Sequence, residues 1–510
     1  MAAVSRSVRG HDVIVVGAGS AGCTLAARLS EDPSRRVLLL EAGDDDPRQR
    51  ALPSPLADAS VLPAFDAAPY DWGLVDQPSH PSRKPIALPR GRVVGGSSAV
   101  NGTFAMRGCR EDYDTWVDLG VPGWGFADVL PVFCALERDL DFGDRPWHGD
   151  RGPVPIRRHP ERERSFAARA YLASAMGAGH PEAEDHNAPD ATGAGPLPVN
   201  AIDGVRMSAA LTHLEPARGR ANLDVRSHAQ VDHIVIERGR AVGVQLVGGG
   251  RLGADIVVLA AGAYASPAIL MRSGVGQADE LARHGIACVA DLPGVGRGLA
   301  DHPMVSFKLP VPAEPAPHAC YQAMVTWRSD GEPGPPDLHL FAWGPVRIDE
   351  PAPSGARLGV NVGLLDPRSR GTVRLATREP MLPPRIDLAY LEHPHDAARM
   401  VAGVREALRI VTTEPLASYA SGIEGAFSED ADDEALAAAV RREVRTYHHP
   451  VGTCRMGPES DPDAVLDARG RLHGVRGIAV ADASVMPAIP RANTNLPTMM
   501  VAERIARWLA

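Results

Sequence analysis

The segment HDVIVVGAGSAG, residues 11–22, decides the fold of this chain. It begins with a short, continuously apolar run of the kind that forms a buried parallel strand. Gly17, Gly19 and Gly22 then follow in G-x-G-x-x-G spacing. The first glycine permits a tight turn, the second lets the backbone approach a pyrophosphate, and the third lets a helix pack closely on the strand. The segment therefore predicts a dinucleotide-binding unit.

The next twenty residues complete that unit. Residues 20–31, SAGCTLAARLSE, predict a crossover helix whose first amides, beginning with Ser20 and Ala21, would hold the phosphates. A second apolar strand, RVLLLEAG, contains Glu41 at its end, where a carboxylate is placed for a ribose hydroxyl. This strand–turn–helix context favours a dinucleotide site over a structural glycine turn, although it does not separate NAD from FAD.

Composition limits the other classes of function. The 510 residues suffice for two domains, and the fractions of apolar and charged residues are typical of a soluble globular protein. A net charge of -10 argues against a nucleic-acid surface. We expect a cytoplasmic protein, because the six cysteines are scattered without a C-x-x-C pair, no secretory leader opens the chain, and no run of about 18 apolar residues occurs.

The remaining pattern predicts a discontinuous nucleotide domain with a second domain inserted. Residues 254–262, ADIVVLAAG, and the later GIAVADASVMP predict further buried strands, and residues 495–509 predict the last helix. Between them, DLHLFAW and RLGVNVGLL predict antiparallel strands, and two helical stretches follow. PRGRVVGGSSAVNG, residues 89–102, is a second glycine-rich loop that could line a flavin or a phosphate or simply connect two elements.

Two adjacent histidines stand near the end of the chain in RTYHHPVGTCRMG, residues 445–457. Neighbouring side chains on an extended strand point to opposite faces, so His448 and His449 are not expected to share one task. The pair His393 and His395 lacks a surrounding set of carboxylates or cysteines, and we expect no metal site there or elsewhere.

Taken in order, these segments resemble the glucose–methanol–choline (GMC) oxidoreductase family. The resemblance is carried by GRVVGGSSAVNGTFAMRGCREDYD, GAYASPAILMRSGVG, LPGVGRGLADHP, HHPVGTCRMG and VADASVMPAIPRANTNLPTMMVAERIA, and it extends from about residue 11 to the last helix. It implies an α/β fold, α+β overall, in which a Rossmann-like FAD-binding domain carries a substrate domain built on a mostly antiparallel sheet with helices. We expect residues 1–160, 200–305 and 440–510 in the FAD-binding domain, and 161–199 and 306–439 in the substrate-binding domain.

The resemblance also implies FAD as the cofactor. Adenine contact is expected from Val231 and ribose contact from Glu41. The other implied cofactor contacts are Val94, Ser97, Asn101, Gly102, Thr103, Asp482, Ala483 and Leu496. Some members attach FAD covalently through a histidine just before the arginine–glycine pair of the loop. That stretch here is ALPRG, with Leu88 at the matching position, so we expect a noncovalent FAD.

For chemistry, the resemblance assigns His449 as the base that takes the hydroxyl proton, while hydride passes to flavin N5. An imidazole with a pKa near neutrality suits that task. Counting back from the last helix makes Asn495 the expected partner, hydrogen-bonded to the substrate oxygen; Asn493 is the alternative, with helix capping as its other interpretation. The N-terminus of the last helix is expected to face the flavin pyrimidine ring.

We expect oxidation of a primary alcohol to an aldehyde, with oxygen or an electron carrier as acceptor. The alternative is a lyase of the same fold that acts on hydroxynitriles. The stretch YQAMVTWRSD shows no aromatic cage or anion for a quaternary ammonium, so an uncharged aliphatic, furanic or benzylic alcohol is the expected substrate. The sequence is also compatible with a homo-oligomer.

Overall fold

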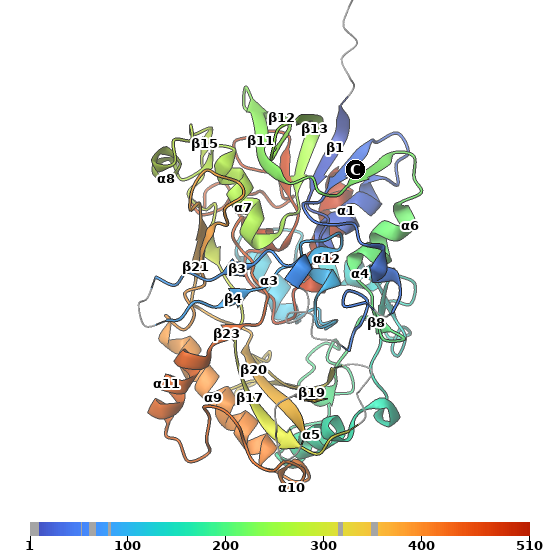
Figure 1. Cartoon of the computed structure of the whole chain (residues 1–510), viewed down its shortest axis with the longest axis vertical. Coiled ribbons are helices and arrows are strands. Elements are labelled where there is room, and N and C mark those ends of the chain that lie inside the picture. Colours follow the sequence, from blue (N-terminus) through green and yellow to red (C-terminus); the bar gives the residue numbers. More distant parts are fainter. Residues whose placement is uncertain are drawn as a thin grey trace, which may run out of the picture.

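The computed structural model describes residues 10–52, 54–60, 68–79, 83–314, 320–347 and 355–509. The chain forms two stacked lobes (Figure 1), one built on a largely parallel sheet at the top and one on an antiparallel sheet at the bottom. Segments from the beginning, middle and end of the sequence meet in the upper lobe. The mixed α/β, Rossmann-like fold expected from the sequence is confirmed.

The upper lobe contains a seven-stranded sheet in the order β10-β2-β1-β13-β12-β11, with β24 paired to β13. Strands β1, β2, β10, β13 and β24 pair in parallel, while β11 and β12 are antiparallel. Continuously apolar strands fit this position, because helices bury both faces of a parallel sheet. The bounds are β1 His11–Val16, β2 Val37–Leu40, β10 Leu223–Arg226, β11 Val231–Glu237, β12 Arg240–Leu246, β13 Arg251–Leu259 and β24 Ile478–Val480.

The lower lobe contains a six-stranded sheet in the order β23-β17-β20-β19-β18-β7. Side chains alternate between its two faces. Leu338, Leu340 and Ala342 belong to the core cluster that also contains buried residues of α5 and α9, whereas His339 and Phe341 are directed to the opposite face. The bounds are β7 Gly193–Pro196, β17 Pro303–Val311, β18 Tyr321–Trp327, β19 Leu338–Arg347, β20 Ala356–Leu364 and β23 Arg445–Thr446.

Helices cover the sheets and link the lobes. Their bounds are α1 Ser20–Leu29, α3 Arg110–Asp118, α4 Phe126–Leu136, α5 Phe166–Gly177, α6 Glu215–Ala217, α7 Gly262–Arg272, α8 Ala278–Arg283, α9 Pro394–Val411, α10 Leu416–Tyr419, α11 Asp433–Glu443 and α12 Asn495–Leu509. Shorter helical turns are η1 Pro47–Arg50, η2 Ala68–Tyr70, η3 Gly96–Ala99, η4 Glu161–Glu163, η5 Ala210–Leu214 and η6 Ala483–Val485. Minor strands are β3 Leu74–Val75, β4 Ala87–Leu88, β5 Glu137–Asp139, β6 Val154–Ile156, β8 Ala201–Ile202, β9 Val205–Arg206, β14 Val275–Gly276, β15 Ala290–Asp291, β16 Arg297–Leu299, β21 Gly371–Arg374 and β22 Arg385–Asp387.

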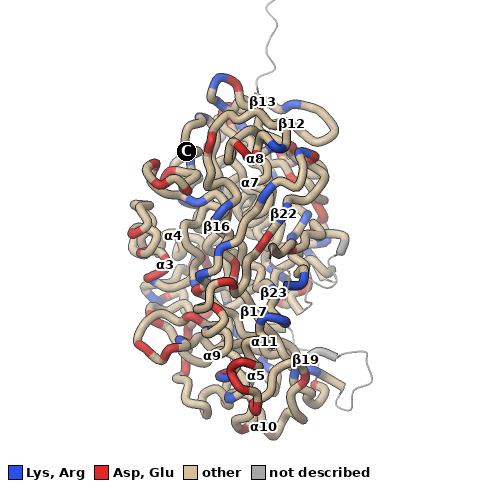
Figure 2. The backbone as a smooth tube through the Cα atoms, turned by 90° about the vertical axis from the view of Figure 1, so that its left-hand side faces the viewer, with Lys and Arg blue, Asp and Glu red and all other residues tan. Residues whose placement is uncertain are grey.

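The expected last helix over 495–509 is confirmed in full. The domain boundaries remain a prediction, with one difference: β23 pairs with β17 of the lower sheet although residues 440–510 were expected in the FAD-binding domain. Acidic and basic residues lie interspersed along the chain in Figure 2. Within the described residues, no helix combines the length and apolarity that crossing a bilayer requires.

Candidate active site

The glycine fingerprint forms the tight strand-to-helix turn that its spacing predicts. Gly17 has φ +97°, and a Cβ there would lie 2.7 Å from the carbonyl oxygen of Ala260. A Cβ on Gly22 would lie 1.8 Å from the carbonyl oxygen of Gly17. For a Cβ on Gly19, the nearest atom among the described residues, its chain neighbours aside, is the Cα of Gly96 at 3.9 Å. The backbone is therefore most open at the glycine that the fingerprint assigns to the pyrophosphate.

The second glycine-rich loop packs directly against the first. A Cβ on Gly96 would lie 2.6 Å from the Cα of Gly19, and the amide of Gly95 donates to the carbonyl of Ala18 at 2.7 Å. Ser97 Oγ accepts a hydrogen bond from the amide of Gly91 at 3.3 Å. The two loops thus form one backbone-lined surface, a contact that no spacing in the sequence could reveal.

Glu41 lies buried at the end of β2. Its carboxylate accepts hydrogen bonds from the amides of Ala18 and Gly43, both at 2.9 Å. Burial raises the pKa of Glu41 above its usual value, partly offset by these amides. Glu41 therefore ties the fingerprint turn to the second strand, beside the position where the fingerprint requires a ribose contact.

The N-termini of α1 and α12 meet at the same place. Ser20 Oγ donates to Asn495 Oδ1 at 2.8 Å. The Asn495 amide nitrogen is buried and has no hydrogen-bond partner among the described residues. Two helix N-termini, open glycine backbone and an unpaired buried amide fit an anionic phosphate group, so the residues present suit FAD.

Other predicted cofactor contacts are held by hydrogen bonds of their own. Asp482 follows β24 and accepts hydrogen bonds from the amides of Gly262 and Ser484; burial raises its pKa. Val94 donates its amide to the carbonyl of Asp44 at 2.8 Å. The remaining predicted positions lie at the end of the second glycine loop and directly after it, at the start of β11, in η6, and in the first turns of α1 and α12: Asn101, Gly102, Thr103, Val231, Ala483, Ala21 and Leu496.

The adjacent histidines separate because they lie in a backbone bulge. The amide of Tyr447 donates to the carbonyl of His302, and the backbone of Val451 exchanges two hydrogen bonds with Ala300. Residues 448–450 therefore loop out between the two ends of an antiparallel pairing. His448 adopts φ +71°, a left-handed conformation that is costly for a non-glycine residue, and it is exposed while His449 is 7% exposed.

The ring of His449 is held from both sides. Its Nδ1 lies 2.9 Å from Nδ1 of His302, and its Nε2 lies 3.1 Å from the amide nitrogen of Asn493. With that amide donating to Nε2, the ring proton of His449 belongs on Nδ1 and is donated to His302. Burial, followed by the neighbouring His302, lowers the pKa of His449 well below its usual value. His449 is therefore a neutral imidazole whose Nε2 carries a lone pair.

The structure places the two candidate asparagines differently. Asn495, which was expected to hydrogen-bond the substrate oxygen beside His449, starts α12, and its side chain accepts a hydrogen bond from Ser20 on α1. Asn493, the alternative, precedes that helix and reaches His449. Its amide oxygen is buried without a hydrogen-bond partner among the described residues. The asparagine that reaches His449 is therefore two residues earlier in the chain than the one that the sequence favoured.

Four aromatic side chains that the sequence did not single out as a group form a cluster, which reaches His449 through Tyr447. They come from the segment after the second glycine loop, from β18 and β19, and from the bulge: Phe104, Tyr321, Phe341 and Tyr447. Ring centroids are 4.7 Å apart for Phe104 and Tyr321, 5.2 Å for Phe341 and Tyr447, and 4.4 Å for Tyr447 and His449. The period-2 pattern of β19 shows that Phe341 faces away from the helices, but it does not show which other rings it meets.

Gly363 makes room for this arrangement. A Cβ there would lie 2.8 Å from Cδ1 of Tyr447, so a larger residue would displace the ring. At the other end of the aromatic cluster, a Cβ on Gly102 would lie 2.9 Å from Cε2 of Tyr321. The aromatic cluster thus extends from the predicted flavin loop to the imidazole of His449.

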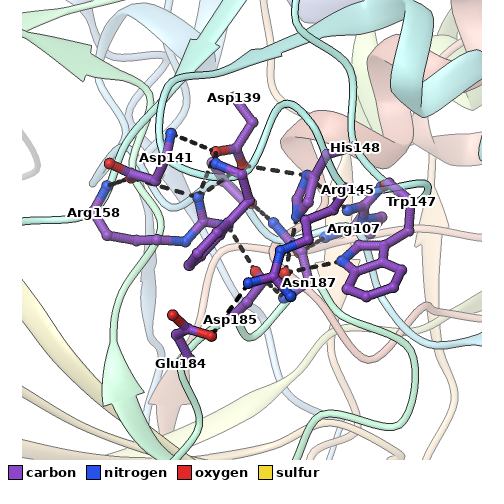
Figure 3. A network of polar contacts seen from close by, with 12 residues as sticks. Arg107, Asp139, Asp141, Arg145, Trp147, His148, Arg158, Glu184, Asp185 and Asn187 are labelled. Carbon is purple, nitrogen blue, oxygen red and sulfur yellow. Dashed lines mark hydrogen bonds and ion pairs between the residues drawn. The ribbon is translucent and has the colours of Figure 1, made fainter.

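A buried polar network supports the segment that carries Phe104. Figure 3 shows much of this network from close by. It joins one histidine and two arginines to three carboxylates: His148, Arg107, Arg158, Glu137, Asp139 and Asp185. The amide of Arg107 donates to Asn187 Oδ1 at 3.1 Å, and Asn187 Nδ2 donates to the carbonyl of Ala105 at 2.8 Å. These contacts fix residues 105–107, which directly follow Phe104.

The charges within this network are balanced. His148 contacts Glu137 through Nδ1 at 2.7 Å and Asp185 through Nε2 at 2.8 Å, so both ring nitrogens act as donors. Burial alone would lower the pKa of His148, but these hydrogen bonds outweigh it and raise the pKa. Glu137, Asp139 and His148 are close enough together to resemble metal ligands. Here protonated His148 and the arginines supply the positive charge that a metal would bring.

The fold and this geometry combine a dinucleotide-binding fingerprint with a buried, neutral imidazole, which is typical of a dinucleotide-dependent oxidoreductase. The N-terminal GMC oxidoreductase model matches residues 11–304 and the C-terminal model matches residues 367–502. The chain belongs to the GMC oxidoreductase family. It is accordingly an FAD-dependent enzyme of the alcohol oxidase and dehydrogenase type.

Individual relatives are similar over almost their whole length. The chain is 36% identical to the 5-(hydroxymethyl)furfural oxidase of Methylovorus sp. strain MP688, covering 97% of this chain and 98% of that protein. It is 33% identical to the oxygen-dependent choline dehydrogenase of Sinorhizobium medicae, covering 97% and 94%. Among solved structures, pyridoxine 4-oxidase from Mesorbium loti superposes with a TM-score of 0.90 at 34% identity, covering 98% and 99%.

Proposed function

We propose that this protein oxidises a primary alcohol to an aldehyde, with His449 as the base. The observation that supports this most directly is the neutral, buried imidazole of His449, held by His302 on one ring nitrogen and by Asn493 on the other. A general base must be unprotonated at the working pH and must have a fixed orientation toward the proton it takes. His449 meets both conditions.

We assign His449 and the two residues that contact its ring different roles in the reaction. When an alcohol binds, its hydroxyl replaces the Asn493 amide as the donor to Nε2 of His449. Nε2 then accepts the hydroxyl proton, and the amide of Asn493 hydrogen-bonds the substrate oxygen beside it. Bound FAD supplies the acceptor for the hydride that leaves the alcohol carbon. Because the site is buried, neighbouring hydrogen bonds rather than water must stabilise the imidazolium that forms. The proton on Nδ1, which is shared with His302, provides one of them.

We propose that FAD is bound without a covalent link. Leu88, at the position where some relatives carry the attachment histidine, is a fully buried aliphatic side chain in β4. It offers no nucleophile. The glycine loops, Glu41 and the two helix N-termini would hold the cofactor by noncovalent contacts.

The aromatic cluster favours an alcohol with a flat ring. Tyr447 packs against His449, and Phe104, Tyr321 and Phe341 extend the aromatic surface from Tyr447. Such groups pack well against aromatic rings. Two of the relatives are named for hydroxymethylfurfural and pyridoxine, which are both hydroxymethyl-substituted aromatic heterocycles. In the sequence, the stretch YQAMVTWRSD showed no aromatic cage. In the structure, its Tyr321 packs against Phe104 and Phe341, so the stretch contributes to an aromatic surface. We propose a benzylic, furanic or pyridine-type primary alcohol as substrate.

Anaerobic titration of the purified holoprotein tests this function. Benzyl alcohol, hydroxymethylfurfural, pyridoxine, 1-butanol, choline and mandelonitrile are added separately while the visible flavin bands are recorded. The proposal predicts bleaching by the ring-bearing alcohols, and admission of air then distinguishes oxygen from a carrier as acceptor. Oxidised bands with every alcohol, together with breakdown of mandelonitrile, would instead favour a lyase.

A further inference from the structure

The hydrogen bonds of one buried carboxylate converge on the bulge that carries His449. We propose that Asp301 is a positioning residue, which holds residues 448–450 in the shape that directs Nε2 of His449 toward the substrate. This inference rests on the proposed role of His449 as base. It concerns Asp301 itself, which does not contact the imidazole ring through any described hydrogen bond.

Asp301 is 3% exposed and receives three hydrogen bonds. Its Oδ1 accepts from the amide of His449 at 2.7 Å. Its Oδ2 accepts from Thr446 Oγ1 at 2.6 Å and from the hydroxyl of Tyr390 at 2.8 Å. All three partners are donors, which suits an ionised carboxylate, and a buried carboxylate is tolerated only when its oxygens are satisfied in this way.

The bulge requires such support because His448 is strained. A left-handed conformation is unfavourable for a residue with a β-carbon, because the β-carbon crowds the following carbonyl oxygen. Thr446 Oγ1, which donates to Asp301, also accepts from the amide of His448 at 2.7 Å. Arg90 donates from Nη1 to the carbonyl of His448 at 2.9 Å. The strained residue is therefore fixed at both its amide and its carbonyl, and its successor is fixed by Asp301.

The position of Asp301 in the chain makes this arrangement specific. Asp301 holds the backbone of His449, and the next residue, His302, holds its ring through Nδ1. Ala300 pairs with Val451 directly after the bulge. One short segment, 300–302, thus sets the path of the bulge and the orientation of the imidazole together. Without the carboxylate, the amide of His449 would be buried without its partner, and relaxation of the bulge would turn the ring.

The test compares paired variants as holoenzymes in rapid-mixing experiments under anaerobic conditions. D301L removes the acceptor at similar size. T446V removes both hydrogen bonds of the hydroxyl, and T446S is its matched control because it retains them. We expect D301L and T446V to lower the limiting rate of flavin reduction roughly tenfold or more, a part of the 10²–10⁴-fold that a positioned base contributes. Substrate Kd should change less than threefold, and T446S should restore the rate.

Crystal structures of the variants provide a readout that does not depend on turnover. We expect D301L or T446V to change the φ of His448 and to lengthen the contact between His449 and His302. If D301L fails to fold, T446V against T446S decides the outcome. Wild-type reduction rates with an unchanged bulge in T446V would overturn the inference, and so would a loss of rate explained entirely by weaker substrate binding.

H449N, measured in the same series, separates this inference from the proposed function. Wild-type flavin reduction by H449N would refute His449 as the base. Slow reduction by H449N combined with wild-type rates in D301L and T446V would leave the base assignment intact and remove only the role of Asp301.

Discussion

Nδ1 of His449 lies 2.9 Å from Nδ1 of His302, in a buried pocket where both imidazoles are neutral. Burial lowers the pKa of His302 to about 3, so His302 accepts the proton of His449 rather than carrying a second positive charge. This contact keeps the proton of His449 on Nδ1 and leaves Nε2, which accepts from the Asn493 amide, as the unprotonated nitrogen.

The first prediction concerns that contact. H302L should leave the Nδ1 proton of His449 buried without an acceptor, which costs about 1–3 kcal/mol and favours the other tautomer. We expect flavin reduction by alcohol to slow roughly tenfold or more, while the visible spectrum of bound flavin is retained. H302N, which keeps an acceptor, is the control and should recover part of the rate.

The second prediction separates the two asparagines. N493A removes the amide beside Nε2 of His449 and should lower the rate of flavin reduction about tenfold to hundredfold with FAD still bound. N495A removes the contact with Ser20 and should chiefly weaken retention of FAD, measured by flavin release during dilution. The opposite pattern, slow chemistry in N495A and normal chemistry in N493A, would restore the pairing expected from the sequence.

The third prediction concerns cofactor attachment. Precipitation of the holoprotein with acid should release all flavin into the supernatant, because Leu88 provides no attachment atom. Fluorescence of the supernatant and absorbance of the redissolved pellet measure the two fractions. Flavin that stays with the pellet would show a covalent link elsewhere in the chain.

The fourth prediction uses the raised pKa of His148. A group whose pKa is higher in the folded protein than in the unfolded chain stabilises the fold below its unfolded pKa, about 6.5. That stabilisation is lost as the pH rises through the folded value. Urea unfolding should therefore show a free energy of unfolding that falls above about pH 6.5 in the wild type. In H148Q the slope over this range should be smaller, and equal slopes would contradict the assignment of a protonated His148.

The sequence predicted the nucleotide-binding half well because its determinants are local. The apolar strand, the glycine spacing and Glu41 all lie within residues 11–41, and the structure places them as the fingerprint requires. The alternating strands DLHLFAW and RLGVNVGLL likewise became β19 and β20 of an antiparallel sheet. Short-range patterns of this kind follow from helix and strand periodicity alone.

The environment of His449 could not be predicted in the same way, because it is assembled from distant segments. Asp301 and His302 contact the bulge although about 147 residues of chain separate them from it. Asn493 lies just before the last helix and contacts the same ring. Whether Asn493 or Asn495 reaches the ring depends on the residue at which α12 begins and on the direction of one side chain. Helix starts and side-chain directions are what sequence patterns fix least well.

Single-turnover flavin reduction in wild type and H449N, measured with one ring-bearing alcohol between pH 5 and 9, tests the role of His449 most closely. We expect the wild-type rate to show no loss near pH 6.5, where an ordinary imidazole becomes protonated, because burial holds the pKa of His449 well below that value. H449N should be slower by about 10²–10⁴-fold at every pH, with flavin bound as in the wild type. An H449N protein that reduces its flavin at the wild-type rate would contradict the central claim.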